Sequence, residues 1–266
     1  MLSELGIERG DVISVVGAGG KTTLCYRIAD AARAAGWTAL VTSTTHMGTL
    51  AEDVTGRVFV ESDGPVDVDL DEALASTRRA TLLGRRVRED KLSGVSASRV
   101  DELVGRADLL VVEADGARGR SLKAPADHEP VLPSSTRLLL VVAGLDVIGR
   151  PLDDTAVHRL AQIRTALALG SSGVRSQDAD WGPADLTPQA VAQVLSWPQG
   201  YPAHRGSARL VAFLNKEEDP RAEAAAAVIA RELVPVYDRV LAGSARSGHV
   251  RVLAVGTQSS GRGLIG

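Results

Sequence analysis

The sequence is poor in cysteine and in aromatic residues, and both shortages narrow the classes of protein that it can encode. Cys25 is the one cysteine among 266 residues, so the chain can form neither an internal disulfide nor a cysteine metal cluster. Cys25 itself falls in an expected helix, where we expect a buried thiol. Aromatic residues make up 3% of the chain and hydrophobic residues 44%. We therefore expect an aliphatic core and a reducing, cytoplasmic location.

Long apolar runs and an excess of positive charge are also missing. No apolar run approaches the roughly 20 residues that a membrane-spanning helix requires, and the N-terminus lacks the basic and apolar segments of a signal peptide. The net charge of −3 argues against a nucleic-acid binder that relies on electrostatics alone. We therefore expect neither a membrane nor a nucleic acid as a partner.

Short apolar runs alternate with alanine-rich helical patterns along the chain, which is typical of a mainly parallel sheet with helices on both faces. We predict a P-loop NTPase-like three-layer α/β/α fold, with residues 1–266 as a single domain that has an elaborated C-terminal region. Residues 170–182 are the best candidate for a lid-like loop. The expected strands are 11–16, 38–42, 58–61, 80–87, 109–114, 137–143, 210–214 and 250–255, and the expected helices are 22–35, 70–77, 96–104, 153–169, 187–195 and 221–233.

The strongest local signal is a glycine-rich segment between the first expected strand and the first expected helix. Glycines let the backbone turn its N–H groups toward phosphate oxygens, and a helix N-terminus adds its dipole. Lys21 is expected to reach the β- and γ-phosphates of ATP or GTP, and the Thr22 hydroxyl is expected to coordinate Mg²⁺. The predicted nucleotide-binding residues of this loop are Gly17, Ala18, Gly19, Gly20, Lys21, Thr22 and Thr23.

The loop departs from the usual pattern G-x-x-x-x-G-K-[ST], because Val15 stands where the first glycine is expected. The shorter form resembles the loops of Mur ligases and of deviant P-loop ATPases that handle metals and partitioning. Those ATPases carry an additional lysine where this chain has Val16, which argues against an ATPase dimer of that kind. The alternative interpretation is a glycine-rich turn that binds no ligand.

Acidic residues end a second apolar strand and resemble a Walker B element. A carboxylate at the end of such a strand can hold Mg²⁺ directly or through water. Asp115 is the first candidate and Glu113 the second, and either can instead polarise an attacking nucleophile. Alternatively, Asp115 only begins an Asp-Gly turn. Residues 42–47, with four hydroxyls and His46, are candidates for contact with phosphate, metal or substrate, or form a simple turn.

Both charge signs are concentrated between residues 115 and 130. Arg118, Arg120 and Lys123 can clamp an anionic substrate or a γ-phosphate. His128 and Glu129 are candidates for acid–base work or for binding a metal. The alternative is a solvated charged loop.

An Asn-Lys pair, Asn215 and Lys216, follows the expected strand 210–214. In GTPases an N-K-x-D element at this place binds guanine, and its aspartate accepts the N1 and N2 hydrogens. Here Glu218 occupies the position of that aspartate and Asp219 follows it, so the choice between ATP and GTP stays open. Alternatively, Asn215 or Asp219 caps the next helix.

Several segments together resemble the YqeC proteins, accessory proteins of selenium-dependent hydroxylases. The segments are GAGGKTT (17–23), TSTTHM (42–47), KLSG (91–94), EADGARGRSLKAPADHEP (113–130), AGLDVIGRPLDDTAVHR (143–159) and FLNK (213–216). The resemblance spans nearly the whole chain and implies a role in maturing selenium-dependent molybdenum hydroxylases, with the hydroxylase or its labile cofactor as a partner. The matching motifs include Asp146 and His158, whose roles it does not define; a lone histidine in the expected helix 153–169 is more often structural. Relatives often have N-K-x-D where this chain has Asn-Lys-Glu-Glu.

Three functions fit these observations. The first is an accessory enzyme that hydrolyses a nucleoside triphosphate or transfers its phosphoryl group, with Lys21 and Mg²⁺ offsetting charge on the γ-phosphate. The second is a small-molecule kinase or a Mur-like ATP-dependent ligase, and the third is a non-catalytic, nucleotide-gated chaperone of the hydroxylase. The catalytic candidates are Lys21, Asp115, Arg118, Lys123, His128 and Glu129; the metal-ligand candidates are Thr22, Asp115 and Glu113; and Asn215 and Lys216 join the loop as nucleotide-binding candidates.

Overall fold

The computed structural model describes residues 1–48, 55–88, 91–169 and 185–256. The strands of these residues are β1 (Val12–Gly17), β2 (Ala39–Ser43), β3 (Met47–Gly48), β4 (Arg57–Val60), β5 (Arg79–Leu83), β6 (Arg86–Arg88), β7 (Lys91–Leu92), β8 (Leu109–Glu113), β9 (Leu122–Lys123), β10 (Leu138–Gly144), β11 (Val157–His158), β12 (Arg209–Asn215), β13 (Arg239–Ser244) and β14 (His249–Val255). The helices are α1 (Leu2–Leu5), α2 (Lys21–Ala34), α4 (Asp67–Thr77), α5 (Ala97–Glu102), α6 (Leu160–Leu169), α7 (Pro188–Ser196) and α8 (Pro220–Leu233), with short 3₁₀ turns η1 (Glu61–Asp63), η2 (Leu145–Val147) and η3 (Tyr201–His204).

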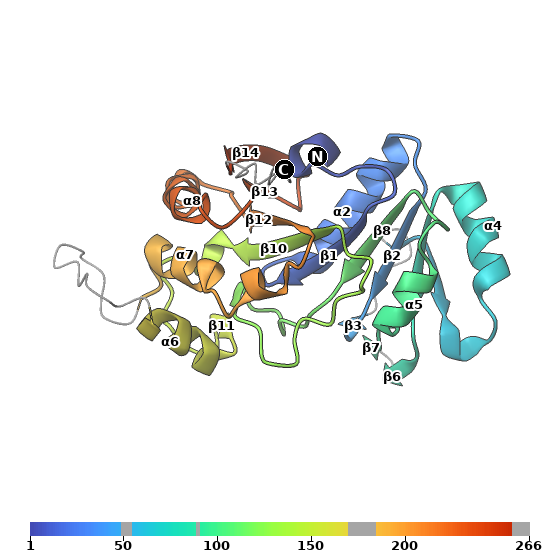
Figure 1. Cartoon of the computed structure of the whole chain (residues 1–266), viewed down its shortest axis with the longest axis horizontal. Coiled ribbons are helices and arrows are strands. Elements are labelled where there is room, and N and C mark those ends of the chain that lie inside the picture. Colours follow the sequence, from blue (N-terminus) through green and yellow to red (C-terminus); the bar gives the residue numbers. More distant parts are fainter. Residues whose placement is uncertain (49–54, 89–90, 170–184, 257–266) are drawn as a thin grey trace, which may run out of the picture.

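One large sheet runs through the described residues (Figure 1). It has nine strands in the order β14-β13-β12-β10-β1-β8-β2-β5-β4. Every neighbouring pair is parallel except β13 and β14 at one edge. Strand β1 lies near the middle, between β10 and β8, so the loop that follows it is flanked by the ends of both neighbours.

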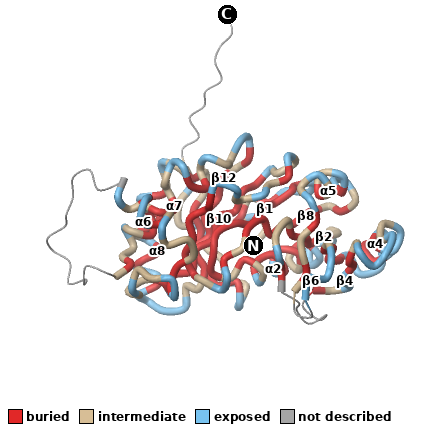
Figure 2. The backbone as a smooth tube through the Cα atoms, turned by 90° about the horizontal axis from the view of Figure 1, so that it is seen from below, coloured by how far each residue is buried: buried red, intermediate tan, exposed pale blue. Residues whose placement is uncertain are grey.

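Helices cover both faces of this sheet and form three layers (Figure 1). Side chains alternate between the faces along a strand, so Ile13 and Val15 pack in the core beside α2, whereas Val12 and Val16 pack in the core beside α4, α5, α7 and α8. Figure 2 shows the buried strands between the more exposed helices. Two covered faces explain the continuous apolar strands and confirm the predicted α/β/α fold with a mainly parallel sheet.

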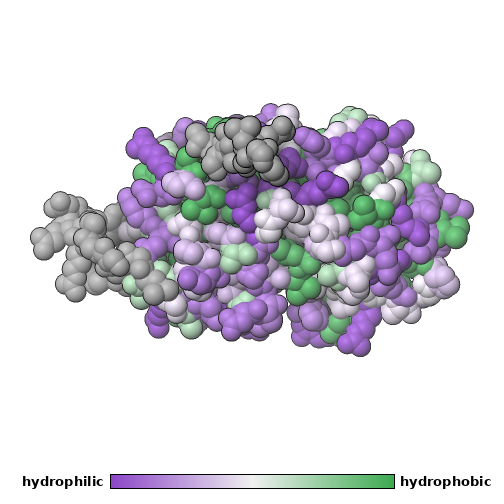
Figure 3. Space-filling model, viewed as in Figure 1, coloured by the Kyte–Doolittle hydropathy of each residue, from purple (hydrophilic) through white to green (hydrophobic). Residues whose placement is uncertain are grey.

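The surface is mixed in character. On the face drawn in Figure 3, hydrophobic residues lie in small groups between hydrophilic ones. The longest described helices, α2 and α8, have 14 residues each. None of the helices in the described ranges combines the length and apolar character needed to span a membrane.

Side-chain caps define the start of three helices. Thr187, which precedes a proline at the first position of α7, accepts a hydrogen bond from the N–H of Ala190 at 3.1 Å. Asp219 caps α8 in the same way, with 2.7 Å between its Oδ1 and the nitrogen of Ala222. Asp219, rather than Asn215, is therefore the helix cap that the sequence left open. Ser96 caps α5 by accepting a hydrogen bond from the N–H of Arg99 at 3.1 Å.

The expected helix 153–169 is shorter than predicted and begins at Leu160. The Asp153 carboxylate accepts hydrogen bonds from the N–H groups of Thr155 and Ala156 at 2.8 and 3.1 Å. Such local bonds compete with helix formation. His158 consequently lies on the short strand β11, paired with Lys123 of β9, and not on a helix.

Two further strand predictions need correction. The expected strand 80–87 divides into β5 and β6, which belong to different sheets. Strand β13 was not predicted, although it lies between β12 and the antiparallel edge strand β14. The expected lid-like loop 170–182 lies outside the described residues.

Candidate functional site

Three glycines bend the chain between β1 and α2. Gly17, Gly19 and Gly20 have φ values of +93°, +84° and +110°, a region that other residues adopt at a cost. Space is limited as well, because a Cβ on Gly17 would lie 2.2 Å from the carbonyl oxygen of Val142, and one on Gly20 would lie 2.4 Å from Asn215 Nδ2. The bend therefore requires glycine for both conformation and contact.

The main-chain N–H groups of this loop fall into two sets. Those of Gly17, Ala18 and Gly19 donate to Asp115 Oδ2 at 3.1 Å, Val142 O at 2.8 Å and Arg120 O at 2.9 Å. The N–H groups of Gly20, the residue before α2, and of residues 21–23 in its first turn have no intrahelical acceptors, and they meet no acceptor in the described part of the chain. The donors that remain for an anion are thus at the start of α2, and the glycine bend shapes the loop.

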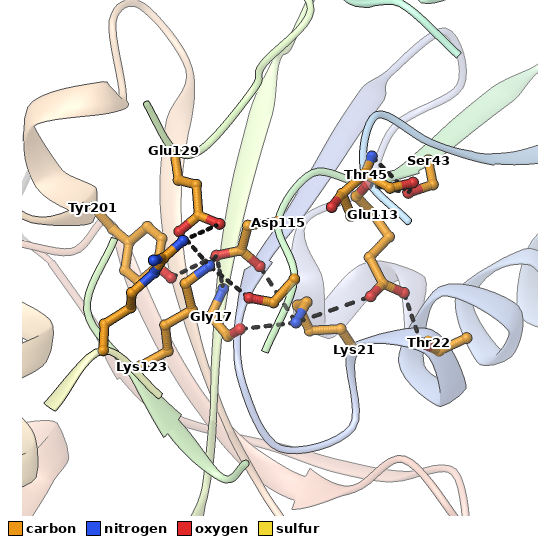
Figure 4. Close-up of polar contacts among 12 residues, drawn as sticks. Gly17, Lys21, Thr22, Ser43, Thr45, Glu113, Asp115, Lys123, Glu129 and Tyr201 are labelled. Atoms are coloured by element: carbon orange, nitrogen blue, oxygen red, sulfur yellow. Dashed lines mark hydrogen bonds and ion pairs between the residues drawn. The ribbon is translucent and has the colours of Figure 1, made fainter. Parts of the chain in front are cut away.

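Lys21 is buried at the start of α2, with its side chain 4% exposed. Its ammonium donates to Gly17 O at 2.8 Å and lies 3.3 Å from Asp115 Oδ1 and 3.9 Å from Glu113 Oε1 (Figure 4). Burial by itself lowers the pKa of Lys21, but the carboxylates of Asp115 and Glu113 outweigh it and raise that pKa above its ordinary value. Lys21 is therefore a charged group held by protein acceptors at the edge of the loop.

Thr22 and Glu113 face each other beside Lys21. The Thr22 hydroxyl donates to Glu113 Oε2 at 2.7 Å, and both residues line an open cavity. Burial raises the pKa of Glu113, against the opposing effects of Lys21 and Thr22. No cluster of three or more acidic, histidine or cysteine side chains suited to a metal occurs within the described ranges. Mg²⁺ typically takes one or two protein carboxylates and completes its shell with phosphates and water, so this oxygen pair fits it.

Asp115 lies below the cavity and is fully buried. Its Oδ2 accepts hydrogen bonds from the Gly17 N–H at 3.1 Å and from the Tyr201 hydroxyl at 2.6 Å, and lies 3.2 Å from Lys123 Nζ. Asp115 is absent from the lining of the cavity, whereas Glu113 borders it. The geometry thus reverses the order of the two acidic metal candidates. Glu113 faces the cavity, whereas Asp115 connects the loop to the buried side chains of Tyr201 and Lys123.

Tyr201 is a site residue that the sequence analysis missed. It comes from the 3₁₀ turn η3, far from every motif along the chain, and only the fold brings its hydroxyl to Asp115. Burial and the nearby Asp115 carboxylate raise the pKa of Tyr201 well above its ordinary value, so the phenol remains a hydrogen-bond donor at neutral pH. No local sequence signal identifies such a partner.

A second buried cation links Asp115 to the far wall of the cavity. Lys123 is fully buried, and its ammonium lies 2.8 Å from Glu129 Oε2 (Figure 4). The other oxygen of this carboxylate, Oε1, lies 3.2 Å from Arg159 Nη2. Burial raises the pKa of Glu129, but Lys123 and Arg159 outweigh it and lower that pKa. Lys123 therefore positions other groups and does not itself face the cavity, whereas Glu129 does.

Positive charge predominates in the cavity above these residues, which has a volume of about 550 Å³. Glu113 and Glu129 are the acidic side chains among its lining residues, and the basic ones are Lys21, Lys91, Arg118, Arg120, Arg159 and Lys216. Arg118, Arg159 and Lys216 are three of the four non-glycine residues with positive φ in the described part of the chain. Strain of this kind gathers at functional sites, and the charge balance suits a polyanion.

The two histidine candidates differ in position. His158 lines the cavity, and burial together with the charges of Lys123 and Arg159 lowers its pKa to about 4. His158 is therefore neutral at pH 7. His128 is exposed and is not part of the cavity lining, because the turn closed by the Glu129 N–H and Ala126 O directs Glu129 inward instead. The structure thus brings Glu129 to the cavity without His128.

A second cavity, of about 530 Å³, adjoins the first and shares Gly20, Thr23 and Lys216 with it. Asn215 connects this cavity to the loop: its Nδ2 donates to Gly19 O at 2.6 Å, and its Oδ1 accepts from the Ala245 N–H at 2.8 Å. The other lining residues include Leu145, Asp146, Ile148, Glu218, Asp219, Arg221, Ala222, Ser244 and Arg246. Segment 244–246 went unnoticed in the sequence because strand β13 was missed.

The fold and the loop define an α/β protein with a glycine-rich loop between a central parallel strand and a helix N-terminus. Comparison with known proteins narrows this class. The family model described as "YqeC protein" matches residues 13–161, more than half of the chain, so the chain belongs to the YqeC family. This finding confirms the resemblance noted in the sequence.

Two individual proteins are also similar. The "Uncharacterized protein YqeC" of Escherichia coli (strain K12) is 34% identical over an alignment of 178 residues, which covers 64% of this chain and 66% of that protein. The match thus leaves about a third of the relative's length outside it. A crystal structure of FtsY from Mycoplasma mycoides has a TM-score of 0.33 and 8% identity, with 92% of this chain and 64% of that chain covered. A similarity at that level carries no argument about function.

Proposed function

We propose that this protein binds a nucleoside triphosphate with Mg²⁺ and hydrolyses it or transfers its γ-phosphoryl group during maturation of a selenium-dependent molybdenum hydroxylase. One observation carries the nucleotide part: Lys21, Thr22 and Glu113 converge at the start of α2, beside a cavity lined mainly by basic residues. The hydroxylase as a partner rests on the family resemblance alone.

The phosphates lie over the start of α2 in this proposal. The N–H groups of residues 21–23 and the helix dipole favour negative charge there. Lys21 exchanges its contact with Gly17 O for phosphate oxygens and keeps Asp115 as its buried counter-charge. The rest of the nucleotide then extends past Gly20 and Thr23 into the second cavity.

Thr22 and Glu113 are the residues that hold Mg²⁺ in this proposal. Bound there, the ion would neutralise charge on the β- and γ-phosphate oxygens. Their oxygens are already adjacent, so Glu113 need only release the Thr22 hydroxyl to become a ligand. Lys21 lies on the opposite side of Glu113 and stabilises the charge that develops on the γ-phosphate.

A second candidate function is phosphoryl transfer or ligation to a small anionic acceptor. It is favoured by Arg118, whose side chain makes no hydrogen bond or ion pair with any described residue although it lines the cavity. His158 and Arg159 lie on the same wall. Release of ADP or GDP that increases with an added acceptor would distinguish this candidate from simple hydrolysis.

Phosphate release tests the proposal. The purified protein is expected to release phosphate from ATP or GTP with Mg²⁺ and to lose at least about 100-fold in rate in the Lys21→Ala variant, because one charged donor to the transition state disappears. Circular dichroism and a Thr165→Ala control, at an exposed position of α6, verify that the fold is intact. Undiminished release by Lys21→Ala would reject the assignment. If the wild type binds the nucleotide tightly but releases no phosphate, the nucleotide-gated chaperone becomes the preferred function.

A further inference from the structure

The second cavity has walls suited to a flat ring. Leu145, Ile148 and Ala222 supply apolar surface. Lys216 lines the same cavity, and its ammonium is fixed by Asp146 at 2.7 Å and by the Ser121 hydroxyl at 3.0 Å. An amine held at its tip keeps the aliphatic part of the side chain in a defined place, where it can pack against a ring.

Most polar side chains of this cavity already form hydrogen bonds or ion pairs within the protein. Asp146 pairs with Lys216, Asp219 caps α8, and Asn215 is bonded on both sides, to Gly19 O and to the Ala245 N–H. These groups shape the cavity and have little capacity left for a ligand. Their contacts also tie the second cavity to the glycine bend, so a ligand that spans both cavities meets a preformed surface.

Glu218 differs from these side chains. It is exposed and lines the cavity, and within the described ranges its carboxylate makes one contact, a hydrogen bond from the Ser244 hydroxyl at 3.3 Å. This bond holds the carboxylate at the end of β13 and leaves the second oxygen and most of the lone pairs available. A carboxylate accepts hydrogen bonds and donates none when ionised.

We infer that Glu218 selects guanine as the base of the nucleotide, an inference that rests on the proposed function above. Guanine presents two neighbouring donors on one edge, N1–H and the 2-amino group, which match the two oxygens of a carboxylate. Adenine presents an acceptor at N1, whose lone pair is repelled by a carboxylate. A site built to bond a donor rejects an analogue that lacks it, because its own polar group is then left unpaired.

Equilibrium binding of the β,γ-imido analogues of GTP, ATP, ITP and XTP (the xanthine nucleotide), with Mg²⁺, tests the inference. The guanine analogue is expected to bind about 10–100-fold more tightly than the adenine analogue, as for a hydrogen bond to a charged group. The inosine analogue lacks the 2-amino group and is expected to fall between them. In Glu218→Gln this preference disappears, and the xanthine analogue gains affinity because an amide matches its O2 acceptor and N1–H donor.

Glu223→Gln is the matched control. Glu223 is exposed like Glu218 but lies on the first turn of α8 and does not line the cavity. It is expected to keep the guanine preference. Equal binding of the guanine and adenine analogues, tighter binding of the adenine analogue, or an unchanged preference in Glu218→Gln would overturn the inference while leaving the proposed function in place. If none of the analogues binds, the proposed function fails as well.

Discussion

The two halves of the cleft are built in different ways. On the phosphate side, Lys21, Asp115 and Lys123 are buried and paired with one another, with side-chain exposures of 4%, 0% and 0%. On the other side, Glu218 and Lys216 are partly or fully exposed and have fewer partners. Any nucleoside triphosphate presents the same phosphates but a different base. Fixed, paired groups for the phosphates and a less constrained Glu218 for the base follow that division of chemistry.

The family match includes parts of both sides. It covers residues 13–161, which contain the glycine bend and the segment from Glu113 to Glu129 as well as Leu145, Asp146 and Ile148 of the second cavity, and it ends before Asn215 and Glu218. Replacement of a buried, paired group is expected to affect folding and function together. Replacement of an exposed group on the base side is expected to affect selectivity alone.

The largest contrast is expected between Asp115→Asn and Glu218→Gln. Asp115→Asn removes the negative charge that compensates the buried ammonium groups of Lys21 and Lys123. We therefore expect the free energy of unfolding to fall by about 3 kcal/mol. Glu218→Gln is expected to change it by less than about 0.5 kcal/mol. Urea unfolding followed by circular dichroism measures both values. Similar losses in the two variants would show that the halves are not built differently.

A smaller effect is expected on the phosphate side for Thr22→Ala. The variant removes one oxygen of the Thr22–Glu113 pair, so nucleotide affinity measured with Mg²⁺ is expected to fall about tenfold, the order of one lost hydrogen bond or ligand. Without Mg²⁺, in EDTA, nucleotide affinity is expected to be nearly the same for Thr22→Ala as for the wild type. A loss of equal size with and without Mg²⁺ would place the effect in the loop and contradict the metal assignment.

The last prediction concerns the pH dependence of stability. The folded-state pKa of His158 is lowered to about 4 from its ordinary value of 6.5, so the unfolded chain binds more protons between these values. Stability from this group is therefore present above pH 6.5 and is lost as the pH falls toward 4. The wild type is expected to lose more stability than His158→Gln across that window, measured by thermal unfolding at pH 7, 5.5 and 4.5. Parallel curves would show that His158 is not held neutral.

Local patterns predicted the fold and the loop well, because their causes are local. The alternation of strand and helix patterns predicted the layered sheet, and the consecutive glycines before Lys21 predicted the bend. The partners of Asp115 could not be predicted, since Tyr201 of the turn η3 and Lys123 of the short strand β9 become its neighbours only in the folded chain. The placement of His158 failed for a different reason: the Asp153 carboxylate forms a turn where the periodicity favoured a helix.

The claim that the start of α2 receives a magnesium–nucleoside triphosphate is tested most directly by isothermal calorimetry. Titration of the wild-type protein with GTP and with ATP, each with Mg²⁺ and at low temperature, is expected to give saturable binding at one site per chain for at least one of them. A weaker heat is expected for Thr22→Ala. Absence of saturable binding by either nucleotide, in a protein shown to be folded, would contradict the account.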